Sequence, residues 1–82
     1  MQVAESRPVI QHTIFLTKKR FSRIGIYLEG DHHPIVCVSH HRSFFLGDII
    51  YIINGKLAIG ARATSWTIWT SKHMSVTVVR SF

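Results

Sequence analysis

Short apolar runs separated by turn-forming residues are the feature that most limits what this chain can fold into. Each run has the length of a β-strand and is too short for a buried helix. Valine, isoleucine, threonine and aromatic residues dominate the runs, and these residues favour strands. The breaks between runs contain turn residues, most clearly Asn54-Gly55, a strong hairpin signal. The 82 residues suffice for one domain with a modest core.

The pattern predicts five to six short strands. The clearest candidates are residues 12–17, 24–28, 35–39, 49–53 and 75–80. The third candidate is apolar throughout, so we expect it to be buried on both faces, with Cys37 packed as a small hydrophobe. Residues 1–11 are expected to form a flexible lead-in, and residues 12–82 a single domain.

Residues 61–72 give conflicting signals. Their threonine-rich composition has poor helix propensity and alternates like a strand. Against this, Arg62, Trp66 and Trp69 are four and three positions apart, which is the spacing of one helical face. Helix and strand both stay open from the local pattern, so the expected fold is mostly β with at most one main helix.

The stretch FSRIGIYLEG, residues 21–30, places a glycine inside an apolar alternation. Glycine weakens a strand and often marks a close approach by another backbone. Four of the ten Lys and Arg residues lie directly before this glycine: Lys18, Lys19, Arg20 and Arg23. With a net charge of +6, the chain favours a partner that is anionic at some point.

Over residues 12–80 the chain resembles a PDZ domain. Arg23-Ile24-Gly25-Ile26 is similar to the X-φ-Gly-φ carboxylate-binding loop of that family. The run LGDIIYIING, residues 46–55, is similar to the family's Gly-Asp, apolar strand and Asn-Gly segment. SVTVVR, residues 75–80, matches its closing strand. The resemblance implies a small, partly open β-barrel or sandwich with one main helix.

One departure from the family concerns the connection between the third and fourth strands. The family usually has a short helix there, but the segment between Ser39 and Gly47 is too short for most of one. That helix is therefore expected to be shortened or absent.

The resemblance also implies a function and a set of site residues. A PDZ domain binds the free C-terminus of a partner protein by β-strand addition, in a scaffolding, adaptor or signalling role within a larger protein. The carboxylate-binding loop would be Arg23, Ile24, Gly25 and Ile26, and the strand that pairs with the peptide would be Ile26, Tyr27 and Leu28. Electrostatic support for binding of the ligand's carboxylate would come from Lys18, Lys19 and Arg20.

The helix of the family lines the opposite side of the groove. Counting back from residues 75–80 without gaps places Arg62, Trp66 and Trp69 on this face. Ser65 then occupies a position where the family has a small residue, and Ile68 a position where it has an apolar one. Counting forward from Asn54-Gly55 shifts the register by one and puts threonines in the groove; we adopt the first register because it leaves large apolar residues where the fold needs them.

Two consequences of this register concern the ligand. Arg62 stands where the family usually has histidine, and an arginine facing the groove would favour Asp or Glu near the third-last ligand residue. If Trp66 and Trp69 instead fill the groove, the domain would act in scaffolding or dimerisation without a peptide.

Other function classes have weaker support. The chain has no Gly-x-Ser-x-Gly elbow and no phosphate-cradling glycine loop, so we expect neither catalysis nor a cofactor. The six histidines lack metal-binding spacing, so no metal is expected. The alternative is a small basic β-barrel that binds nucleic acid or anionic phospholipid, although crowding of the cations into residues 18–23 disfavours nucleic acid.

Weak homo-association through the terminal Arg-Ser-Phe82 also stays open. No apolar stretch has the length of a membrane span. We expect a cytoplasmic location, with the inner membrane surface as an alternative through the parent protein.

Overall fold

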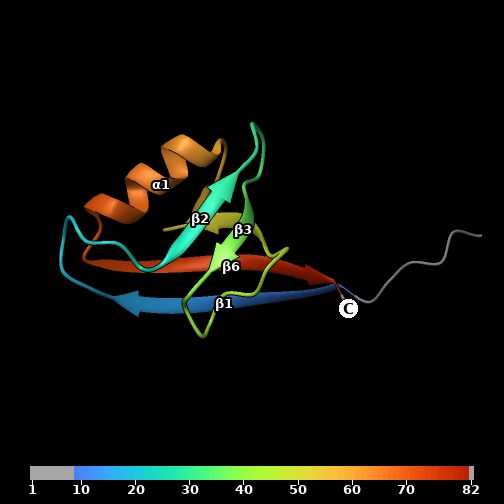
Figure 1. The fold of residues 1–82 in the computed structure, drawn as a ribbon, viewed down its shortest axis with the longest axis horizontal. Coiled ribbons are helices and arrows are strands. Elements are labelled where there is room, and N and C mark those ends of the chain that lie inside the picture. The colour runs from blue at the N-terminus through green and yellow to red at the C-terminus, as the bar shows by residue number, and fades with distance from the viewer. Residues whose placement is uncertain (1–8, 82) are drawn as a thin grey trace, which may run out of the picture.

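A computed structural model describes residues 9–81 as a six-stranded antiparallel sheet and one helix (Figure 1). In chain order the elements are β1 (Val9–Thr17), β2 (Ile26–Glu29), β3 (Ile35–Ser39), β4 (Ile49–Ile53), β5 (Lys56–Leu57), α1 (Ala61–Thr70) and β6 (His73–Ser81). The strand order is β1-β6-β4-β3-β2, with β5 paired to β4. The sheet is not closed into a barrel, so β1 and β2 are its edges. A mostly β fold with one helix is therefore confirmed for these residues.

Strand boundaries follow the pairing partners. β3 and β4 have the predicted bounds, whereas β1 and β6 are longer than predicted because they pair without interruption from Val9 opposite Ser81 to Thr17 opposite His73. β1 thus includes residues 9–11 of the expected lead-in; residues 1–8 of that lead-in lie outside the described residues. β5 was not predicted, because a two-residue strand has no periodicity to detect.

The core lies on one face of the sheet. Strands β1, β3, β4 and β6, helix α1 and two loops contribute buried apolar residues to it. These residues are Ile14, Val36, Phe44, Ile50, Ile53, Ala58, Ile68, Met74, Val76 and Val78. The expected burial of both faces of β3 is wrong. Val36 is buried, but its neighbours Ile35 and Cys37, which point to the opposite face, are exposed, because an antiparallel sheet can leave its second face to solvent.

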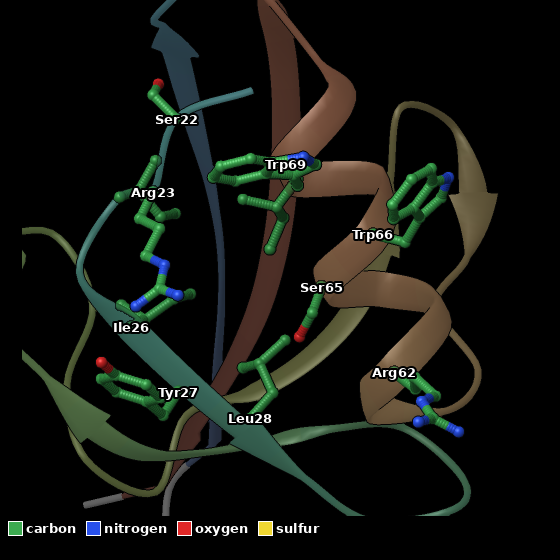
Figure 2. Close-up of a pocket in the computed structure, with 11 residues that line it drawn as sticks. Ser22, Arg23, Ile26, Tyr27, Leu28, Arg62, Ser65, Trp66 and Trp69 are labelled. Carbon is green, nitrogen blue, oxygen red and sulfur yellow. The ribbon is translucent and has the colours of Figure 1, made fainter. Parts of the chain in front are cut away.

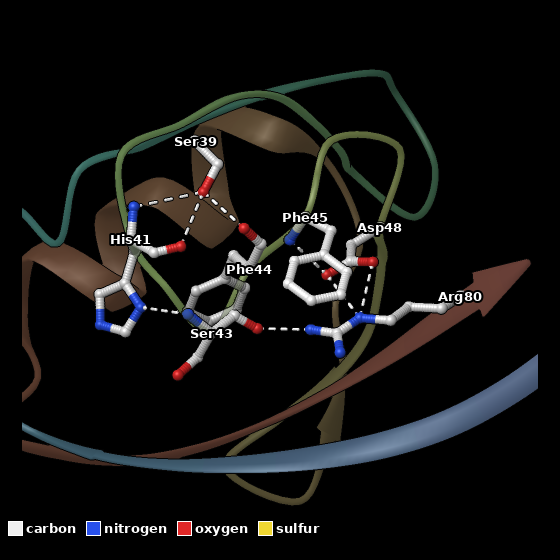
Figure 3. Close-up of polar contacts among 7 residues, drawn as sticks. All are labelled: Ser39, His41, Ser43, Phe44, Phe45, Asp48 and Arg80. Carbon is white, nitrogen blue, oxygen red and sulfur yellow. Dashed lines mark hydrogen bonds and ion pairs between the residues drawn. The ribbon is translucent and has the colours of Figure 1, made fainter.

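The connection from β3 to β4, residues 40–48, contains no helix. Polar contacts hold it instead (Figure 3). Arg80 on β6 donates from Nε to both oxygens of the buried Asp48 carboxylate, and the backbone N–H of Phe45 donates to Asp48 Oδ2 at 2.9 Å. At the other end of the connection, Ser39 Oγ donates to the carbonyl of Phe44 at 2.6 Å. These bonds fix a short irregular segment where the resembling family has a helix.

Residues 61–70 form helix α1 in spite of their composition. Hydroxyl groups bond back to carbonyls one turn earlier, from Thr67 to Ala63 and from Thr70 to Trp66, both at 3.1 Å. The buried residues Thr64 and Ile68 are four apart and anchor one helical face on the core. Tertiary packing therefore overrides the strand-like propensity. Among the described residues no helix is long and apolar enough to cross a bilayer.

Candidate functional site

A groove of about 480 Å³ lies between β2 and α1 (Figure 2). Three segments line it: the end of the loop before β2, β2 itself, and one side of α1. Its walls are mainly apolar, with contributions from Ile24, Ile26, Leu28, Ile68 and Trp69. Most of the residues predicted for the site line this groove; Gly25, Lys18, Lys19 and Arg20 do not.

β2 forms one wall as an edge strand. It pairs with β3 on one side, and in the described part of the chain no strand pairs with its other side. Edge strands leave a row of backbone N–H and C=O groups available for another strand. Ile26 and Leu28 are half-buried and line the groove, whereas Tyr27 is 52 % exposed. The predicted peptide-edge residues therefore do lie beside the cavity.

The turn before β2 depends on Gly25. Its φ of +84° lies in the left-handed region, which excludes it from the predicted strand and favours glycine. The carbonyl of Gly25 accepts a hydrogen bond from the His40 N–H at 2.7 Å, which ties the turn to the end of β3. Among the hydrogen bonds of residues 9–81, none uses the backbone N–H of Ile24 or Gly25 as donor. Both amides are thus unpaired within the described chain; Ile24 lines the groove and Gly25 is adjacent to it in the sequence.

The side of α1 that lines the groove carries the three predicted helix residues, together with Ser65 and Ile68. Figure 2 shows Ser65 pointing towards Leu28. Trp66 lines the groove as predicted, but it is 66 % exposed, so most of its surface faces solvent. Because Thr64 and Ile68 face the core, their successors Ser65 and Trp69 face the groove.

The remaining predicted helix residues lie at the two ends of the groove. Arg62 is exposed and lines the groove near the start of α1, and in Figure 2 its guanidinium points away from β2. Trp69 is half-buried at the other end and makes an edge contact with Phe21, with ring centroids 6.4 Å apart. The two tryptophans leave the groove unfilled. Ser22 also lines the groove, and no sequence signal indicated it.

Backbone hydrogen bonds tie both ends of α1 to the loops that flank β2. At the start of the helix, Ala61 N–H donates to the carbonyl of Gly30 at 2.9 Å. At its end, the carbonyl of Trp69 accepts from the Phe21 N–H at 2.7 Å and from the Lys18 ammonium at 3.1 Å. These bonds fix the separation of α1 and β2, and with it the width of the groove.

The cations expected to support the site divide into two groups. Arg23 lines the groove, whereas Lys18, Lys19 and Arg20 do not. Lys18 instead donates to the carbonyls of Lys19 and Trp69, and desolvation by burial lowers its pKa. Lys18 is therefore a structural link between the loop and the helix.

The histidines make other contacts. His33 Nδ1 lies 2.8 Å from the carbonyl oxygen of Ala58, and His41 Nδ1 accepts from the Ser43 N–H at 3.1 Å. Over residues 9–81, no three His, Cys, Asp or Glu side chains come together in a way that could hold a metal ion.

Comparison of the chain with family models, with curated proteins and with solved structures found no match. The residues and geometry of the groove are accordingly the grounds for a functional assignment.

Proposed function

We propose that this chain is a PDZ-like peptide-recognition module that binds the free C-terminus of a partner protein. The observation that carries the proposal is the unpaired edge of β2 beside an apolar groove. An extended peptide adds to such an edge through main-chain hydrogen bonds, and neighbouring pockets select its side chains. The scaffolding or adaptor role of the whole protein belongs to the same proposal.

The direction of the peptide follows from the position of the turn. The free amides of Ile24 and Gly25 lie at the start of β2, so a carboxylate held there requires the peptide to run antiparallel to β2. The last ligand side chain then enters the end of the groove between Ile26 and Trp69. The third-last residue lies towards Leu28, near the start of α1.

Magnitudes indicate which contacts dominate the affinity. Burial of one aliphatic side chain contributes about 1.5–3 kcal/mol, and a hydrogen bond to a charged group about 1.5–3 kcal/mol. An exposed ion pair with Arg62 adds only about 0–1 kcal/mol. We expect a dissociation constant in the micromolar range, equivalent to about −8 kcal/mol.

Amidation of the ligand tests the proposal. An immobilised library of peptides with free C-termini is screened first, and the strongest binder is synthesised with a free carboxylate and with an amide. Loss of the charged hydrogen bonds should weaken binding by about tenfold or more, measured by calorimetry. A library without binders, or equal affinity for both forms, would overturn the proposal.

Salt dependence separates this function from binding of nucleic acid. Affinity for the carboxylate peptide should fall only gently with salt, because the apolar pocket is insensitive to screening. Binding through phosphate neutralisation falls steeply. A steep dependence would therefore count against capture of a peptide in the groove.

A further inference from the structure

The loop before β2 carries cations that form no ion pair with a carboxylate of residues 9–81. Lys19, Arg20 and Arg23 are exposed, and the ion pair found among residues 9–81 is the distant pair of Arg80 with Asp48. Lys72 joins this group, because its carbonyl accepts from the backbone N–H of Lys18 at 2.8 Å. We call residues 18–23 together with Lys72 the basic loop.

The acidic residues of the described chain lie elsewhere. Glu29 ends β2 and Asp31 follows in the next turn, so both are at the end of β2 opposite to the basic loop. Asp48 is buried and paired. Within residues 9–81 the charge is therefore segregated, and the basic loop presents a positive surface without an acidic neighbour from this part of the chain.

An aromatic residue lies among these cations. Phe21 is 62 % exposed, and its φ of +59° is a left-handed conformation that is unfavourable for a residue with a Cβ. Its N–H bond to the Trp69 carbonyl and its edge contact with the Trp69 ring hold it in this conformation. The loop is thus fixed to the end of α1 in a conformation that exposes an aromatic side chain.

We propose that the basic loop docks on the anionic leaflet of a phospholipid bilayer, with Phe21 at the level of the headgroups. Anionic lipids attract clustered Lys and Arg residues, and exposed aromatic rings bind in the interface. Single-stranded nucleic acid is bound instead by several aromatic side chains along a basic groove, whereas this loop offers one. The inference is independent of peptide capture, because Phe21, Lys19, Arg20 and Lys72 do not line the groove.

Vesicle co-sedimentation without any peptide tests the electrostatic part. The whole chain is mixed with vesicles of phosphatidylcholine alone, or of phosphatidylcholine partly replaced by phosphatidylserine; binding is expected only to the second. The double variant Lys19→Gln/Arg20→Gln should lower the affinity by roughly tenfold or more. The matched variant Arg42→Gln/Lys56→Gln removes two exposed cations that lie outside both the basic loop and the groove, and should have a much smaller effect.

Substitution of Phe21 tests the aromatic part. Phe21→Gly suits the positive φ, so the thermal stability should be unchanged or higher while vesicle binding falls several-fold. Phe15→Ala is the control, since Phe15 is 80 % exposed on β1; it should bind vesicles like the unchanged chain. Failure to bind phosphatidylserine vesicles, equal losses in the two double variants, or full binding by Phe21→Gly would each overturn the proposal. So would stronger binding to a single-stranded oligonucleotide that does not depend on Phe21.

Discussion

Arg80 Nε lies 2.9 Å from one carboxylate oxygen of Asp48 and 3.1 Å from the other, although the two residues are 32 positions apart in the chain. The guanidinium also donates to the carbonyl of Ser43 and stacks 4.0 Å over the ring of Phe45. Asp48 therefore holds the irregular connection before β4 against β6. This connection also contains His40, whose N–H fixes the carbonyl of Gly25.

The first prediction concerns this ion pair. Asp48→Ala leaves Arg80, whose side chain is 13 % exposed, without its carboxylate, so the free energy of unfolding should fall by about 3–5 kcal/mol. Urea denaturation measures the loss. The control is Asp31→Ala, because Asp31 is exposed and its loss should change stability by less than about 0.5 kcal/mol. Similar losses in the two variants would contradict a stabilising role for the pair.

The second prediction separates backbone strain from ligand binding at Gly25. Gly25→Ala and Gly55→Ala each place a Cβ on a residue with positive φ, +84° and +79° respectively. Both should lower stability by about 1 kcal/mol. Only Gly25→Ala should also weaken binding of the carboxylate peptide, because Gly55 lies in the hairpin between β4 and β5. Equal peptide affinity in both variants would show that the turn does not contact the ligand.

The third prediction compares the contributions of the two tryptophans to the groove. Trp69→Ala removes part of the wall at the end of the groove and should weaken peptide binding by about tenfold. Trp66→Ala removes a ring that is 66 % exposed and should change the affinity less than about threefold. Calorimetric titration of both variants with one peptide measures the difference. A larger effect from Trp66 than from Trp69 would contradict the expected order.

The fourth prediction concerns selection near the third-last ligand residue. Arg62→Glu should reverse a preference of a few-fold, from peptides with Asp or Glu at this position to peptides with Lys. Competition between the two peptides gives the ratio directly. Lys56→Glu makes the same charge change outside the groove and should leave the ratio unaltered. An unchanged ratio in Arg62→Glu would mean that the arginine serves only as a solvated rim residue.

The sequence predicted the strands best where burial imposes a pattern. Residues 35–39 and 49–53 have the observed bounds, and Asn54-Gly55 forms the predicted turn before β5. Helix α1 could not be assigned, because the local propensity favours a strand and the packing of Thr64 and Ile68 on the core that overrides it depends on the tertiary fold. The sequence also could not predict that the outer side of β3 is exposed, because the side chains on both faces of this strand are apolar.

For the candidate site, the sequence predicted helix residues that line the groove, but not how far each of them is exposed. Counting back from residues 75–80 without gaps placed Ile68 at an apolar position, and Ile68 packs on the core. Trp66 lines the groove yet is 66 % exposed, which the spacing alone could not predict. The basic run before Gly25 was noticed, yet sequence alone could not show that Lys18 binds the end of α1 while Lys19 and Arg20 face solvent.

The hydrogen bonds that fasten both ends of α1 bear on how fast a ligand can enter. With Ala61 bonded to Gly30 and Trp69 bonded to Phe21, no slow opening step has to precede insertion of the peptide. Stopped-flow traces should then be single exponentials whose rate rises linearly with peptide concentration, at about 10⁵–10⁷ M⁻¹s⁻¹. Selectivity among C-terminal peptides would consequently come from differences in their dissociation rates.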